Sequence, residues 1–236
     1  MARYPGLFEE YFEKGKLDKS RWKAIYDGDF TEAAVDVIDV DSGENIDFRL
    51  RLRANTIGTS NPLKYLGVRS KKKVALDNAK VFRFDLDWNN QANGSYLSAS
   101  FYLCPTESNN PKEEDNWLKF EYVGVPPGRN VRINILEKAN GAVRPLYTDW
   151  GLRDDHGRPL GKPLGLFSHR IAIILDKNSL RVIQDDETLF PLSKHNLNFT
   201  TAYIYLQMSS GTNYPSREVY FDNIIVRNAF SARRLP

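Results

Sequence analysis

Apolar and polar residues alternate in short runs along most of this chain, a period-2 pattern that predicts β-strands. Turn-forming residues separate the runs, as at Asn93-Gly94 and Pro126-Pro127-Gly128. Helical periodicity is almost absent: Tyr11–Trp22 has room for one helical turn, but Gly15 interrupts it. The pattern therefore predicts an all-β fold, a two-sheet antiparallel β-sandwich of the jelly-roll kind. The expected strands are Ala33–Val40, Ile46–Ala54, Tyr65–Ser70, Lys80–Trp88, Tyr96–Leu103, Trp117–Val123, Val131–Glu137, Arg170–Leu175, Ser179–Gln184, Ala202–Ser209 and Glu218–Val226.

One predicted strand, within Asn116–Gly124, carries the most distinctive side chains. Alternation places Trp117, Lys119 and Glu121 on one of its faces, about 7 Å between alternate residues. An aromatic ring, a cation and a carboxylate in a row suit a sugar-binding surface. The residues on the opposite face, which suit a buried core, are Leu118, Phe120 and Tyr122.

The composition fits a folded domain and argues against nucleic-acid binding. The chain has 236 residues, of which 41% are hydrophobic and 12% aromatic, enough to bury a substantial core. Because no stretch resembles a linker, we expect one jelly-roll domain over residues 1–228 and a C-terminal tail at 229–236. Its 33 basic residues are interspersed with 30 acidic ones, which is not a nucleic-acid footprint. The dense run Lys71-Lys72-Lys73 falls in an expected turn and is interpreted as solvated.

Cysteine and histidine are too scarce for an internal disulfide or a zinc site. Cys104 is the single cysteine, and its apolar neighbours indicate a buried thiol. None of the three histidines belongs to a ligand pair. No apolar run is long enough to span a membrane, and none near Met1 has the form of a signal-peptide core.

Three separated motifs carry a family resemblance. Leu7–Phe12 and Leu17–Trp22 place an acidic-Phe segment before Leu-Asp-x-Ser-x-Trp; Ser95–Pro105 leads to Asn116–Gly124; and Val219–Val226 contains Phe-Asp-Asn-Ile-x-Val. Together they resemble the opening, the catalytic strand pair and the last strand of family 16 glycoside hydrolases, within the concanavalin A-like lectin/glucanase superfamily. The resemblance extends to related carbohydrate-binding and laminin G-like modules. It implies a jelly roll with a sugar-binding concave face and an extracellular or cell-surface setting.

The catalytic strand of those hydrolases reads Glu-x-Asp-x-Glu, with the nucleophile first and the general acid/base last. Aligned by the trailing Gly124, these positions hold Trp117, Lys119 and Glu121 in this chain. A retaining mechanism needs two carboxyl groups about 5–5.5 Å apart, and only the acid/base position keeps one. An ammonium at Lys119 favours the ionised form of Glu121, whereas a general acid must be protonated. We therefore expect the hydrolase machinery to be absent.

The same surface suits non-catalytic binding of a polysaccharide or glycan. Sugar rings stack on aromatic rings, and sugar hydroxyls need charged or amide partners. Because tyrosine has a high β propensity, any single outward tyrosine can also be purely structural. One candidate, Trp150, falls in the long irregular region Leu146–Phe167. The expected ligand-binding residues are Trp117, Lys119, Glu121, Tyr203, Tyr205, Gln207, Tyr102 and Trp150.

The resemblance also implies one structural calcium ion where the N-terminal segment crosses the last strand. The implied ligands are side-chain and backbone oxygens of Asp222 and backbone carbonyls near Glu10 and Gly43. Calcium accepts such oxygens at about 2.3–2.6 Å. The alternative is that Asp222 only hydrogen-bonds a neighbouring loop.

Two other classes of function remain open. One is an enzyme, either a hydrolase with rearranged carboxylates or a lyase with a Tyr or His base beside a cation that neutralises a uronate. The other is a structural or adhesive module that contacts proteins. The residues that a lyase would recruit are Tyr203, Tyr205, Lys119, Arg83 and His169.

Overall fold

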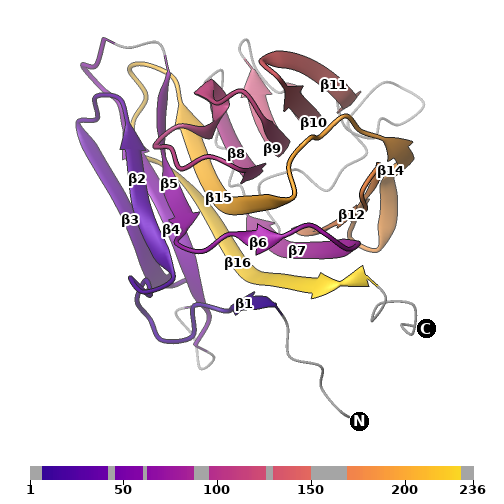
Figure 1. The fold of residues 1–236 in the computed structure, drawn as a ribbon. Coiled ribbons are helices and arrows are strands. Elements are labelled where there is room, and N and C mark those ends of the chain that lie inside the picture. Colours follow the sequence, from indigo (N-terminus) through magenta and orange to yellow (C-terminus); the bar gives the residue numbers. More distant parts are fainter. Residues whose placement is uncertain are drawn as a thin grey trace, which may run out of the picture.

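The computed structural model describes residues 7–41, 46–60, 63–87, 96–125, 130–149 and 169–229. Within these ranges the chain forms β-strands and one 3₁₀ helix, η1 (Pro111–Glu113), but no α-helix. The strands build two sheets of eight strands each, and their pairs are antiparallel. The predicted all-β, two-sheet architecture is confirmed (Figure 1).

The first sheet, called sheet A, contains the last long strand at its centre. Its order is β14-β13-β12-β7-β16-β4-β3, and β1 pairs with β16 beside β7 and β4. The bounds are β14 (Glu187–Lys194), β13 (Ser179–Gln184), β12 (His169–Leu175), β7 (Lys80–Asp87), β16 (Arg217–Asn228), β4 (Phe48–Asn55), β3 (Glu32–Asp39) and β1 (Phe8–Glu10).

The second sheet, called sheet B, contains the strand that carries Trp117, Lys119 and Glu121. Its order is β11-β10-β9-β8-β15-β5-β2, and β6 pairs with β15. The bounds are β11 (Ala142–Asp149), β10 (Asn130–Ala139), β9 (Trp117–Val125), β8 (Leu97–Cys104), β15 (Thr201–Ser210), β5 (Lys64–Ser70), β2 (Trp22–Asp27) and β6 (Val74–Ala75).

One apolar cluster fills the space between the two sheets. Phe84 of sheet A stacks on Phe101 of sheet B, with ring centroids 4.6 Å apart. Trp22 is buried in the same cluster. Alternate residues of each strand point into this core because successive side chains of a strand face opposite sides. On β9 these are Leu118, Phe120 and Tyr122, as predicted.

Sheet A joins the two ends of the described chain. The first strand, β1, pairs with the last strand, β16, with Phe8 opposite Val226 and Glu10 opposite Ile224. In Figure 1 the indigo strand β1 runs beside the yellow strand β16. Tyr11–Trp22 forms no helix, in agreement with the interruption at Gly15; Phe12 and Gly15 have φ values of 54° and 62°, which belong to turns and not to a helix.

Candidate ligand-binding site

Strand register places a row of polar side chains across the outer face of sheet B, the face turned away from the shared core. Glu121 of β9 lies opposite Ser100 of β8 and Asn134 of β10. Ser100 in turn lies opposite Gln207 of β15. A second row beside it contains Tyr205, Tyr102 and Lys119, which are also register partners. The sequence-predicted residues of these three strands therefore meet on one surface.

The carboxylate of Glu121 is at the centre of this surface and is fully engaged by neighbours. Lys119 forms an ion pair with Oε2, and Asn134 donates to Oε1 from 2.9 Å. The hydroxyl of Ser100 lies 3.5 Å from Oε2. Both members of the ion pair are buried. The contacts that Glu121 makes within the described residues are therefore to an ammonium, an amide and a hydroxyl, not to a second carboxyl group.

Two buried polar groups beside this pair have no hydrogen-bond partner among the described residues. They are the hydroxyl of Tyr102 and the Nε2 of Gln207. The Lys119 ammonium lies 5.2 Å from the centroid of the Tyr102 ring. Burial, followed by the charge of Glu121, raises the pKa of Tyr102 well above its ordinary value, so its hydroxyl remains a donor. The surface thus holds two donors able to serve acceptors of a ligand.

The loop between β8 and β9, residues 105–116, covers one end of the outer face. The Tyr205 hydroxyl donates to the Thr106 carbonyl at 2.6 Å and accepts from the Ser108 amide at 3.0 Å. The Trp117 indole donates to the Lys112 carbonyl at 3.3 Å. Burial raises the pKa of Tyr205 to about 12, although the hydrogen bond from Ser108 opposes it. At this end of sheet B, which the loop covers, buried side chains form a second, smaller apolar cluster.

Trp117 is consequently not the solvent-facing aromatic plate that alternation suggested. Its side chain lies on the predicted face, but only 2% of it is exposed. Its ring packs edge-on against Tyr102, with centroids 5.8 Å apart. The expectation failed because a period-2 pattern assigns a face but does not reveal that a loop folds over it.

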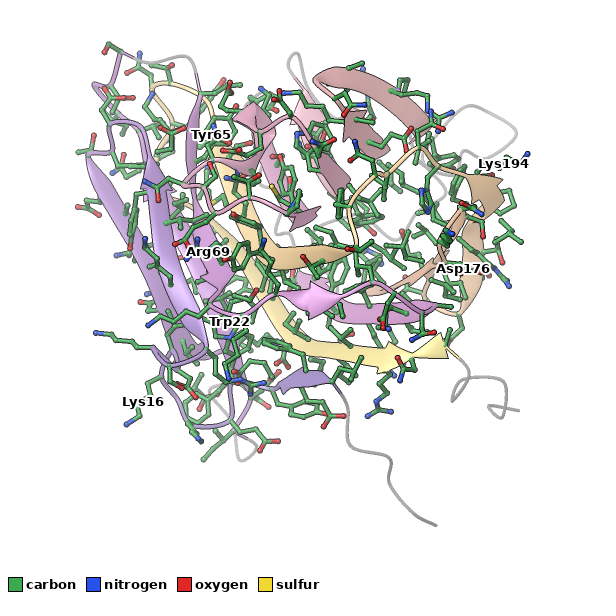
Figure 2. The ribbon with its side chains drawn as sticks, in the orientation of Figure 1. Lys16, Trp22, Tyr65, Arg69, Asp176 and Lys194 are labelled. Atoms are coloured by element: carbon green, nitrogen blue, oxygen red, sulfur yellow. The ribbon has the colours of Figure 1, made fainter. Side chains whose placement is uncertain are left out.

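Tyr203 lies at the loop end of the same strand, β15, but is only half-buried and is flanked by cations. The guanidinium of Arg69 lies 4.8 Å from its ring centroid, and the ammonium of Lys73 lies 5.2 Å from it. Arg69, labelled on β5 in Figure 2, also pairs with Glu107 of the β8–β9 loop. This end of the outer face is therefore aromatic and positively charged.

The residues that a lyase would recruit are divided between the two sheets. Lys119, Tyr203 and Tyr205 lie on sheet B, whereas Arg83 lies on β7 and His169 on β12 of sheet A. His169 is used there in a 2.7 Å contact between its Nδ1 and Asp185. The fold thus separates Arg83 and His169 from the others, whereas Tyr205 and Lys119 share the outer face of sheet B, each opposite Tyr102.

Asp222 of β16 has the properties of a cation ligand. Its Oδ1 is buried and has no hydrogen-bond partner in the part of the chain that the structure describes. Burial is the main cause that raises the pKa of Asp222 to about 7, and a bound cation would relieve the cost of its ionised form. The side chain of Glu10 is committed to the Trp22 indole and the Phe12 amide, 3.2 Å away in each case, so only its backbone carbonyl fits the expected role.

Two expected residues, Trp150 and Gly43, lie outside the described residues. Across the described ranges, no three or more His, Cys, Asp or Glu side chains gather into a metal-binding group. Because the expected calcium ligands are mostly backbone carbonyls, a calcium site here does not need such a group of side chains. The calcium ion therefore remains a prediction.

Sequence reasoning missed Asn134 and Arg69. Asn134 alternates with Ile133 and Ile135, both core residues, and this alternation was the signal that places it on the outer face. Arg69 gave no such signal, because its contact with Tyr203 depends on the pairing of β5 with β15.

The two-sheet jelly-roll fold is similar to those of solved glucanases and family 16 glycoside hydrolases. A mixed-linkage glucan family 16 hydrolase of Bacteroides ovatus, solved with a product, matches with a TM-score of 0.64 at 15% identity over 93% of this chain and 99% of its own. The Bacillus licheniformis β-glucanase matches with a TM-score of 0.61 at 12% identity over 96% and 100%. The laminarinase catalytic domain of Thermotoga petrophila matches with a TM-score of 0.60 at 13% identity over 96% and 98%.

No protein-family model matches the chain, and no curated protein matches its sequence. At 12–15% identity, the likeness to these enzymes defines the fold of this chain. Within the described residues no helix is long and apolar enough to cross a membrane.

Proposed function

We propose that the chain binds a polysaccharide or glycan on the outer face of sheet B without cleaving it. The observation that carries the proposal is the pair of buried donors, the Tyr102 hydroxyl and the Gln207 amide, beside the Glu121–Lys119 ion pair. A buried donor without an acceptor costs about 1–3 kcal/mol. The hydroxyl and ring oxygens of a sugar supply acceptors for both groups.

The surroundings of Glu121 support binding over hydrolysis. Retaining hydrolysis needs a second carboxyl group about 5–5.5 Å away, yet the contacts of Glu121 are Lys119, Asn134 and Ser100. Glycan-active enzymes with low sequence identity to this chain have a similar fold. This likeness supports a polysaccharide as the ligand class.

Ligand entry requires a movement of the β8–β9 loop, because the donors are buried. Several polar contacts fix the loop to the sheet, including those of Thr106 and Ser108 with the Tyr205 hydroxyl and the ion pair of Glu107 with Arg69, and ligand entry must break some of them. Displacement of the loop exposes the Trp117 ring to a sugar. Hydrogen exchange of residues 105–116 should therefore change when a ligand binds.

The test is to measure retention and turnover on one panel of neutral and acidic polysaccharides. Retention without release of reducing ends or unsaturated uronates is the expected result. Product release from any member would contradict non-catalytic binding and favour an enzyme. Retention of none would contradict glycan binding altogether and favour a protein-contact module.

A matched pair of tyrosine variants links retention to the outer face. Tyr102→Phe removes a hydroxyl without a protein partner, so it should leave stability nearly unchanged and weaken binding about tenfold. Tyr122→Phe removes a core hydroxyl that donates to Gln184 at 2.6 Å, so it should lower stability and leave binding unchanged. The reverse pattern would place the site elsewhere.

A further inference from the structure

A cavity of about 690 Å³ lies at the edge of the sandwich, away from the polar rows of the outer face. Segments far apart in the sequence line it: the start of β1, the end of the β1–β2 connection, the β5–β6 turn, and the segment from β6 to the start of β7. Its lining is both apolar and basic. It includes Phe8, Val74, Arg21, Lys72, Lys73 and Lys80.

The positive charge of this cavity is only partly balanced by the protein. Arg21 pairs with Glu10 at 3.4 Å, and Lys80 pairs with Asp77 at 3.3 Å. Lys72 and Lys73 have no carboxylate partner within the described residues, and both are exposed. The lysine run interpreted from sequence as solvated therefore contributes two uncompensated charges to a cavity wall.

Lys80 gives the cavity a fixed donor. Its side chain is buried, with 2% exposed, and its ammonium contacts the Asp77 carboxylate and the Asn78 carbonyl at 3.1 Å. An ammonium has three N–H donors, so one remains for a ligand. Because burial and two hydrogen bonds hold it in place, this donor needs little ordering on binding.

Lys73 connects the cavity with the outer face of sheet B. It lines the cavity, and its ammonium lies 5.2 Å from the ring centroid of Tyr203. The guanidinium of Arg69 contacts the same ring. Lys73 therefore links the cavity to the Tyr203 end of the outer face, where Arg69 is buried and paired with Glu107.

We infer that this cavity binds the sulfate or carboxylate groups of an acidic polysaccharide whose chain continues past Tyr203 onto the outer face. The inference rests on the proposed glycan binding and names the substrate class. Sulfate and carboxylate oxygens accept charge-assisted hydrogen bonds from ammonium and guanidinium donors. A neutral sugar has no charged group to pair with the ammonium groups of Lys72 and Lys73.

The experiment compares acidic polymers with neutral polymers of the same backbone. Dextran sulfate is compared with dextran, and polygalacturonate with its methyl ester, by titration calorimetry at an ionic strength of about 0.15 M. The parent protein should bind the acidic member of at least one pair on the order of tenfold more tightly. Preference for sulfate alone or for carboxylate alone identifies which group the cavity takes.

Two double variants assign the preference to the cavity. Lys72→Gln/Lys73→Gln should abolish the acidic preference, because it removes the two unpaired charges. Lys16→Gln/Lys71→Gln removes the same charge from two exposed lysines outside the lining, one of them labelled in Figure 2, and should keep the preference. All four positions are exposed, so both variants should fold.

The outcomes separate the two proposals. Equal binding of acidic and neutral polymers by the parent, or an unchanged preference in Lys72→Gln/Lys73→Gln, overturns the cavity inference and leaves glycan binding standing. A loss of preference in both double variants indicates overall charge and also overturns it. Binding of no polymer overturns both proposals.

Discussion

Removing the ammonium from the centre of the outer face should leave a buried carboxylate without its counter-charge. In Lys119→Met the side-chain volume is nearly kept, while Glu121 loses its ion pair. The side chains of Lys119 and Glu121 are 9% and 6% exposed, so water replaces the lost interaction poorly. Breaking a buried pair on one side costs about 3–5 kcal/mol.

The expected loss lies near the lower end of this range. Asn134 still donates to Glu121 at 2.9 Å, and Ser100 remains 3.5 Å away, so the carboxylate keeps part of its stabilisation. We therefore expect Lys119→Met to lower the free energy of unfolding by about 3 kcal/mol, a large part of a typical stability of about 5–15 kcal/mol. The double variant Lys119→Met/Glu121→Leu should recover most of the loss, because no unpaired charge remains.

Urea unfolding of the parent, both single variants and the double variant gives the coupling free energy directly. Lys23→Met is the matched control, since Lys23 is exposed on β2 and lies 3.9 Å from Glu107. It should change stability by no more than about 1 kcal/mol. If Lys119→Met costs no more than Lys23→Met, or the two central substitutions are additive, the buried ion pair does not exist.

Three further outcomes follow from buried groups elsewhere. Trp117→Ala should lower stability by about 3–5 kcal/mol, because the ring is buried beneath the β8–β9 loop; a loss below about 1 kcal/mol in denaturant unfolding would contradict that burial. Burial raises the pKa of Cys104 to about 11, so a disulfide reagent at pH 8 should modify it only after unfolding, and rapid modification of the native protein would be inconsistent with the packing. Calcium should raise the melting temperature of the parent but not of Asp222→Asn. With a chelator present, the free energy of unfolding should fall by about 2 kcal/mol, after allowance for partial exposure, as the pH rises from about 4 towards 7. The reason is that the pKa of Asp222 is raised from 3.8 to about 7 in the folded protein, so its ionisation opposes folding. If Asp222→Asn with chelator shows the same pH profile, this cause is refuted.

Most strands were predictable from alternation, which missed β1, β2, β6, β11 and β14; the last two share a physical reason. Ser179–Gln184 agrees with β13 at both ends, and several others differ by a residue or two. The missed strands β11 and β14 contain Pro145 and Pro191, and proline argues against a strand unless the strand is at an edge. Both strands are the edge strands of their sheets at one end of the order. Single-sequence pattern cannot tell an edge from a centre, since that depends on pairing.

The candidate site was predictable in its face but not in its enclosure. The period of two placed Glu121, Lys119, Tyr102 and Gln207 on a common surface, as the register confirms. Burial of Trp117 depends on the carbonyl of Lys112 and on the turn around η1. These contacts arise from how a loop folds back, which leaves no periodic mark in the sequence. The cavity lining was hidden for the same reason, because it joins separate segments.

The pairing of β1 with β16 sets the order in which the chain can complete its structure during synthesis. β16 also separates β7 from β4 in the centre of sheet A, so that sheet has a gap until the ribosome has released residues 217–228. Until then the inner faces of β4 and β7 have no central partner, and their apolar residues are open to other chains. Such long-range pairing also slows folding. A chain shortened before β16 should therefore be insoluble, not partly folded, and chaperone demand should be greatest just before residues 217–228 are released.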